Sequence, residues 1–163
     1  MSEQKNYNTI EEAINDLLEG EQKENALNLA VYLKENNMSP NMAKEGKTRY
    51  NDEYNIGWMI INGKDNWYFE VFDSLHYQYG YEDDDADFVA AVHKRVNICE
   101  SPCHDQCWRA KDVKVFGKEF KSVCSQHSGE FVNPNAAELG YIKKLVEYRK
   151  REKPYVQQYH SYN

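Results

Sequence analysis

Apolar runs long enough to cross a membrane are absent from this sequence. No stretch approaches the roughly 20 apolar residues that a membrane-spanning helix needs. The N-terminal residues 1–13 contain neither a basic segment nor an apolar core, so we expect no cleaved signal peptide. These two absences predict a cytoplasmic protein without a membrane partner, in a compartment where thiols stay reduced.

Motifs of the common enzyme classes are missing as well. The sequence has no nucleophile elbow, Walker loop, dinucleotide-binding glycine fingerprint, H-E-x-x-H motif or EF-hand loop. Glycine and proline are sparse, with 8 and 4 residues, and no linker rich in either divides the chain. We therefore expect a single domain over residues 1–153 and a C-terminal tail over residues 154–163. The missing motifs favour a binding role over catalysis, and a thiol-dependent enzyme stays open as an alternative.

The charge is distributed unevenly along the chain. Residues 1–90 contain 7 Lys and Arg against 19 Asp and Glu, a net charge of −12, whereas residues 91–163 contain 13 against 8, a net charge of +5. Such a division can indicate a nucleic-acid-binding face. It is also typical of two halves of one domain that attract each other, and the total charge of −7 opposes binding to a phosphate backbone. Nucleic acid is therefore not the expected partner.

Helical periodicity recurs in several places. Thr9 and Glu12 match a capping box, and apolar residues at helical spacing follow until Gly20. Residues 37–55 are polar and aperiodic, which predicts a loop. The remaining elements that we expect are helices over 24–36, 84–98 and from Pro134 to about Lys150, a strand over 113–116 and a short helix over about 118–127.

A β-hairpin over residues 57–72 is the clearest local signal. Residues 57–61 and 66–72 are rich in aromatic and β-branched side chains, and Asn62-Gly63 between them favours a type I′ turn with a loop of two or four residues. The fold class predicted from these elements is α+β, with an antiparallel sheet that includes this hairpin packed against several helices. The expected faces are Trp58, Ile60, Trp67, Phe69 and Val71 on one side, and Met59, Ile61, Tyr68 and Phe72 on the other.

Since both faces of this hairpin are apolar, each is either covered or lines a pocket. Glu70 interrupts the apolar pattern, so it is either a hydrogen-bonded edge residue or a carboxylate that contacts a ligand. The candidate pocket residues are Trp58, Trp67, Tyr68 and Glu70.

All four cysteines lie within residues 99–124, and a histidine follows. In a reducing compartment, clustered cysteines indicate metal binding more often than disulfides. Zinc takes four tetrahedral ligands, typically thiolates and imidazoles, and ligands from two separate segments would clamp those segments together. The predicted zinc ligands are Cys99, Cys103, Cys107, Cys124 and His127.

Two other interpretations of the cysteines stay open. Buried reduced cysteines behave as small apolar residues, and this role suits Cys99 on the apolar face of the helix expected before it. A thiol–disulfide switch is the second alternative. The spacing C-x₃-C-x₃-C differs from the usual zinc knuckle, and His104 within it is either a ligand or a solvated loop residue.

The C-terminal third resembles a pattern found in small uncharacterised proteins of low-GC Gram-positive bacteria. The similarity runs from Cys99 through Phe116-Gly-Lys-Glu-Phe120 and Cys124 to Asn133-Pro134 and the basic helix that ends near Lys150. This resemblance implies that the cysteines act together, and it implies no particular activity.

The leading hypothesis is thus a binding or interaction protein with a structural zinc site, whose partner is another protein or a small molecule. A small-molecule sensor with an aromatic pocket on the 57–72 hairpin is the second hypothesis, and a thiol redox switch is the third.

Overall fold

The structure of this protein, a computed structural model, describes residues 7–42, 47–51, 55–71, 82–99, 110–124 and 129–151. These residues form an antiparallel sheet, a separate β-hairpin and helices, which confirms the α+β class. The helices are α1 (Ile10–Leu17), α2 (Gly20–Glu35), α3 (Ala86–His93) and α4 (Ala136–Arg151). The strands are β1 (Ser39–Met42), β2 (Lys47–Asn51), β3 (Asn55–Ile61), β4 (Trp67–Val71), β5 (Ala110–Val115), β6 (Lys118–Cys124) and β7 (Glu130–Val132).

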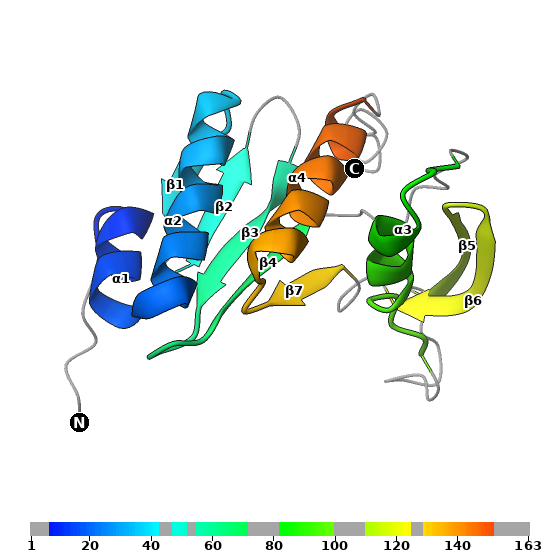
Figure 1. Cartoon of the computed structure of the whole chain (residues 1–163), viewed down its shortest axis with the longest axis horizontal. Coiled ribbons are helices and arrows are strands. Elements are labelled where there is room, and N and C mark those ends of the chain that lie inside the picture. The colour runs from blue at the N-terminus through cyan, green and yellow to red at the C-terminus, as the bar shows by residue number, and fades with distance from the viewer. Residues whose placement is uncertain are drawn as a thin grey trace, which may run out of the picture.

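The larger sheet has the strand order β1-β2-β3-β4-β7, and helices α1, α2 and α4 cover one of its faces (Figure 1). Side chains alternate between the two faces of a strand, so every second residue points to the helices. The core lies between the sheet and these helices, because the helix-facing side chains are buried. They are Thr48, Tyr50, Met59, Ile61, Trp67, Phe69, Val71 and Phe131.

Capping hydrogen bonds begin two of the helices that cover the sheet. The Thr9 hydroxyl accepts the backbone N–H of Glu12, as the capping box predicts. Asn135 and Glu138 cap α4 reciprocally, since each side chain accepts the backbone N–H of the other. Four apolar residues of α4 that the periodicity places on one stripe are buried: Leu139, Ile142, Leu145 and Val146.

The loop predicted over residues 37–55 is wrong, because β1 and β2 lie within this range. β1 contains Pro40 and polar residues, which is tolerated because β1 is the edge strand of the sheet. In β2, Thr48 and Tyr50 are buried on one face, and Lys47 on the other face is exposed. β2 lies between β1 and β3 and consists mostly of polar residues, so its sequence carries a weak strand signal although both of its sides are paired.

The predicted hairpin is confirmed as β3 and β4, but its turn and its faces differ from the prediction. Ile61 pairs with Trp67, and the Asn62 N–H donates to the Asn66 carbonyl at 2.8 Å, which leaves a loop of three residues. Gly63 and Asp65, not Asn62 and Gly63, adopt positive φ, so the turn is not of type I′.

Residues 82–124 lie between β4 and β7 in the chain, although these two strands are neighbours in the sheet. α3 and the β5–β6 hairpin therefore form an insertion, and Figure 1 shows them beside α4 and away from the sheet. The third predicted helix is confirmed, with Asp85 as its cap, but it ends at His93 instead of Ile98. The short helix predicted over 118–127 is wrong, because residues 118–124 form β6.

Candidate metal centre

Cys99 lies on an extended segment that follows α3 and not on a helix. Ile98 forms an antiparallel bridge with Val123, and the Cys99 N–H donates to the Ser122 carbonyl at 2.8 Å. This segment therefore runs along one side of β6, while β5 pairs with the other side. Cys99 is partly buried there.

Cys124 is the last residue of β6, and its backbone pairs with Ala110 at the start of β5. The connection over residues 100–109, which carries Cys103 and Cys107, begins beside Ser122 and ends beside Cys124. Neighbouring strands are about 4.8 Å apart, and two residues span about 7 Å along a strand, so Cys99 and Ala110 are separated by roughly 10–12 Å.

The described residues on either side of His127 are Cys124 and Gly129. The Gly129 N–H donates to the Arg95 carbonyl at 3.2 Å. Arg95 precedes Cys99 by four residues. Cys103, His104, Cys107 and His127 themselves lie outside the described residues. Within the described ranges, no group of three or more His, Cys, Asp or Glu side chains could hold a metal ion.

The candidate pocket residues of the hairpin are divided between the two faces of the sheet. Trp67 points to the helices, is fully buried and donates its indole N–H to Gln22 at 3.0 Å. Trp58, Tyr68 and Glu70 point to the opposite face, where each is partly buried. Trp67 therefore cannot share a pocket with the other three, and this part of the prediction is corrected.

Two carboxylates meet on this opposite face. Glu70 of β4 pairs directly with Glu130 of β7, and Tyr68 lies on the same face. Partial burial, followed by the charges of Glu130 and Glu70, raises the pKa of Tyr68 above its usual value. The phenol therefore stays protonated at neutral pH.

The insertion is attached to α4 by a polar and aromatic cluster that the sequence analysis missed. The Asp83 carboxylate accepts from the Lys144 ammonium at 2.7 Å and from the Tyr148 hydroxyl at 2.5 Å, and its side chain is 7% exposed. The Lys144 ammonium also lies 4.4 Å from the ring centre of Phe88, which stacks on Tyr148. No local pattern could reveal these contacts, because Asp83 lies more than 60 residues from its partners.

A second attachment joins the end of α3 to the large sheet. The Arg95 guanidinium forms an ion pair with Glu138, at the start of α4, and stacks on the ring of Phe131 at 4.0 Å. Together the two attachments fix α3 and its flanking residues against α4 and β7.

Replacing Asp83 with asparagine is expected to lower the free energy of unfolding at pH 7 by about 1.5–3 kcal/mol. The carboxylate accepts hydrogen bonds from Lys144, Tyr148 and the Asp85 N–H, and asparagine removes its charge and one of its two acceptor oxygens at a mostly buried site. Urea denaturation followed by circular dichroism measures this change. The matched control is Asp84→Asn at an exposed position, which should change stability by less than about 0.5 kcal/mol.

The effect of Asp83→Asn should also depend on pH. Burial by itself raises the pKa of Asp83, but hydrogen bonds from Lys144, Tyr148 and the Asp85 N–H outweigh burial and hold the pKa below 3.8. The ionised carboxylate therefore stabilises the protein above that value, and this contribution is lost as the pH falls through the lower folded-state pKa. A stability difference that stayed constant from pH 7 to pH 3 would contradict this assignment.

Comparison with models of protein families, with curated proteins and with solved structures finds no match. Among the described helices, none is both long and apolar enough to span a membrane.

Proposed function

We propose that this protein is a cytoplasmic binding protein whose insertion is held together by a structural zinc ion. The ligands would come from Cys99, Cys103, Cys107 and Cys124, with His127 as the alternative to one of the thiolates. In this role the zinc ion would connect residues 100–109 to β6. The large sheet and its helices would carry the insertion.

The observation that supports this proposal is the position of the two ends of the 100–109 connection. They flank the C-terminal end of β6, one beside Ser122 and the other beside Cys124. In this proposal Cys103 and Cys107 belong to the connection between these two ends, so they are the thiols that would join Cys99 and Cys124 at the metal.

A structural zinc ion would also stabilise an insertion that is too small to have a large core of its own. The described part of the insertion consists of one short helix and one hairpin, and a two-stranded hairpin alone is marginally stable in water. Small units of this kind usually need a metal or disulfides in addition to their core. Because reduced thiols are expected in the cytoplasm, zinc ligation is the chemistry that fits.

Protein purified without added metal and without a histidine tag is expected to contain about one zinc per chain by elemental analysis. Cysteine-to-serine substitutions at positions 99, 103, 107 and 124 are made one at a time. Each substitution that removes a zinc ligand should lower the zinc content to background. Ser101→Ala, a change within the same segment, is the matched control and should keep the zinc. Chelation should lower the melting temperature by about 5–10 °C, which corresponds to 2–3 kcal/mol for a chain of this size.

Two results would contradict the proposal. One is a chain that binds no zinc even after incubation with the metal, and whose four thiols all react at the rate of exposed cysteine. The other is rapid formation of an intramolecular disulfide in metal-free protein under mild oxidant, which is the behaviour of a redox switch.

A further inference from the structure

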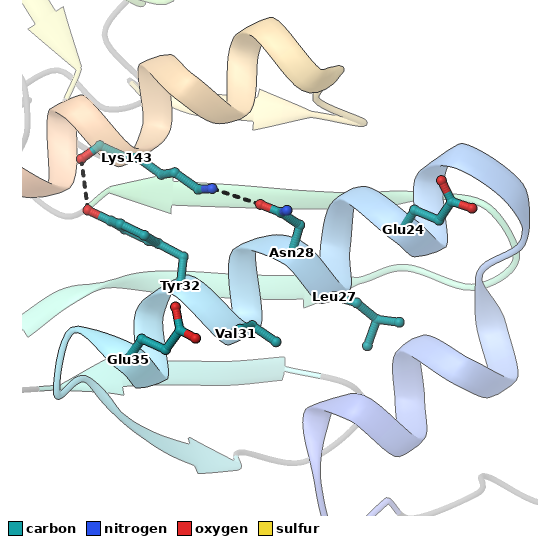
Figure 2. Close-up of a pocket in the computed structure, with 7 residues that line it drawn as sticks. All are labelled: Glu24, Leu27, Asn28, Val31, Tyr32, Glu35 and Lys143. Carbon is teal, nitrogen blue, oxygen red and sulfur yellow. Dashed lines mark hydrogen bonds between the residues drawn. The ribbon is translucent and has the colours of Figure 1, made fainter.

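An open groove runs along the side of α2 that faces away from the sheet (Figure 2). Its volume is about 460 Å³, and α2 supplies every lining residue except one. The lining residues are Glu24, Leu27, Asn28, Val31, Tyr32, Glu35 and, from α4, Lys143.

The floor of the groove is apolar. Val31 is 49% exposed, and it is one of three exposed large apolar residues within the described part of the chain. Leu27 lies one turn before Val31, on the same side of α2, and is partly buried. The other two exposed residues, Ile98 and Val132, lie on other elements and do not line this groove. An exposed valine beside a leucine forms an apolar surface that an apolar side chain of a partner can contact.

The two ends of the groove are acidic. Glu24 and Glu35 are exposed, and eleven residues of helix separate them, which corresponds to about 16 Å. The one cation in the lining, Lys143, donates to the Asn28 side chain at 2.7 Å and lies 5.0 Å from the ring centre of Tyr32. Beside the groove, Glu147 accepts from the Tyr32 hydroxyl at 2.8 Å and forms an ion pair with Lys150 at 4.0 Å.

We propose that this groove binds a basic amphipathic helix of a partner protein. One or two apolar side chains of that helix would lie on Leu27 and Val31, and lysine or arginine side chains one to two turns away on each side would reach Glu24 and Glu35. Helices pack along one another through such ridges and grooves, and a short apolar floor between acidic ends selects cationic flanks. The net charge of −12 on residues 1–90 attracts the same kind of partner over a longer range.

This inference gives a partner class to the binding role proposed above, but it does not depend on the metal. The contact is small, so the affinity is expected to be weak and reduced by salt. Zinc content measured on the same samples decides the metal proposal separately. If the chain contains zinc but does not bind the helical peptide described below, only the proposal for the groove is wrong. If it binds the peptide but contains no zinc, only the proposal for the zinc site is wrong.

The probe is a fluorescein-labelled helical peptide of about five turns, built from leucine and lysine with leucine on one face. Fluorescence anisotropy with the full chain should give a dissociation constant of tens of micromolar. The counterpart with glutamate in place of lysine should bind at least about tenfold more weakly, because like charges would meet at both ends of the groove. Amide chemical shift changes in NMR spectra should be confined to α2 and the neighbouring turn of α4.

Variants separate the groove from general attraction by an acidic protein. The double charge reversal E24K/E35K should weaken binding by about five- to tenfold, and Val31→Asp by about tenfold. The charge-matched control E82K/E119K changes two exposed acidic residues elsewhere and should weaken binding less than about twofold. Equal effects of the two double variants, or shift changes centred outside α2, would overturn the proposal.

Discussion

Replacing Gly57 with alanine is expected to lower the free energy of unfolding by at least about 3 kcal/mol and the melting temperature by roughly 6–12 °C. A Cβ atom at this position of β3 would lie 2.2 Å from the backbone oxygen of Glu70 and 3.1 Å from the ring of Phe69. The oxygen belongs to the neighbouring strand β4, so it can move away only if β3 and β4 separate. Thermal and urea denaturation followed by circular dichroism measure the loss.

Gly140→Ala is the matched control for this change. Gly140 lies on the exposed side of α4, where a Cβ atom meets nothing within 4 Å. Alanine has the higher helix propensity, so this variant should gain about 0.5–1 kcal/mol. If Gly57→Ala were also neutral or stabilising, the close approach of β3 and β4 at this position would be wrong.

Replacing Trp67 with alanine is expected to cost about 3–5 kcal/mol. Trp67 is the largest fully buried side chain among the described residues, and its loss would leave a cavity between the sheet and the helices. It would also leave the Gln22 carbonyl without the indole N–H that it accepts. Denaturation should be followed by circular dichroism, because the substitution itself alters tryptophan fluorescence.

The companion variant is Trp58→Ala on the opposite face of the same hairpin. Trp58 is only partly buried, so the expected cost is below about 2 kcal/mol. The two tryptophans thus test the pairing of β3 with β4. A severe effect at Trp58 together with a mild effect at Trp67 would mean that the faces of the hairpin are exchanged.

The faces of this hairpin show why the sequence analysis placed the strands correctly and the side chains incorrectly. A loop of two or four residues puts Trp58 and Trp67 on one face, whereas a loop of three residues puts them on opposite faces. Contacts outside the hairpin accompany the observed loop. The Asp65 N–H donates to the Leu17 carbonyl, and the Asp65 carboxylate accepts the Glu19 N–H, each at 3.0 Å.

The region of the candidate metal centre is a second place where the local sequence pattern did not predict the structure. Phe120 and Val123 are spaced as on a helix, but in β6 the backbone of Ser122 adopts positive φ, and the register with β5 shifts nearby. This irregularity changes the alternation of side chains, so a strand carries apolar residues at helix-like spacing. The cysteine spacing could suggest a metal, but only the pairing of β6 on both sides brings the ends of the 100–109 connection together.

The sequence by itself determined the features that depend on neighbouring residues: the cap at Thr9, the apolar stripe of α4, the strands of the 57–72 hairpin and the α+β class. Such features need only interactions within a few turns or one pair of strands. The tertiary structure decided the features that depend on distant partners: the polar strands β1 and β2, the face to which Trp67 points, and the attachment of Asp83 to Lys144 and Tyr148. Their free energy comes from contacts between segments far apart in the chain, and no local pattern records it.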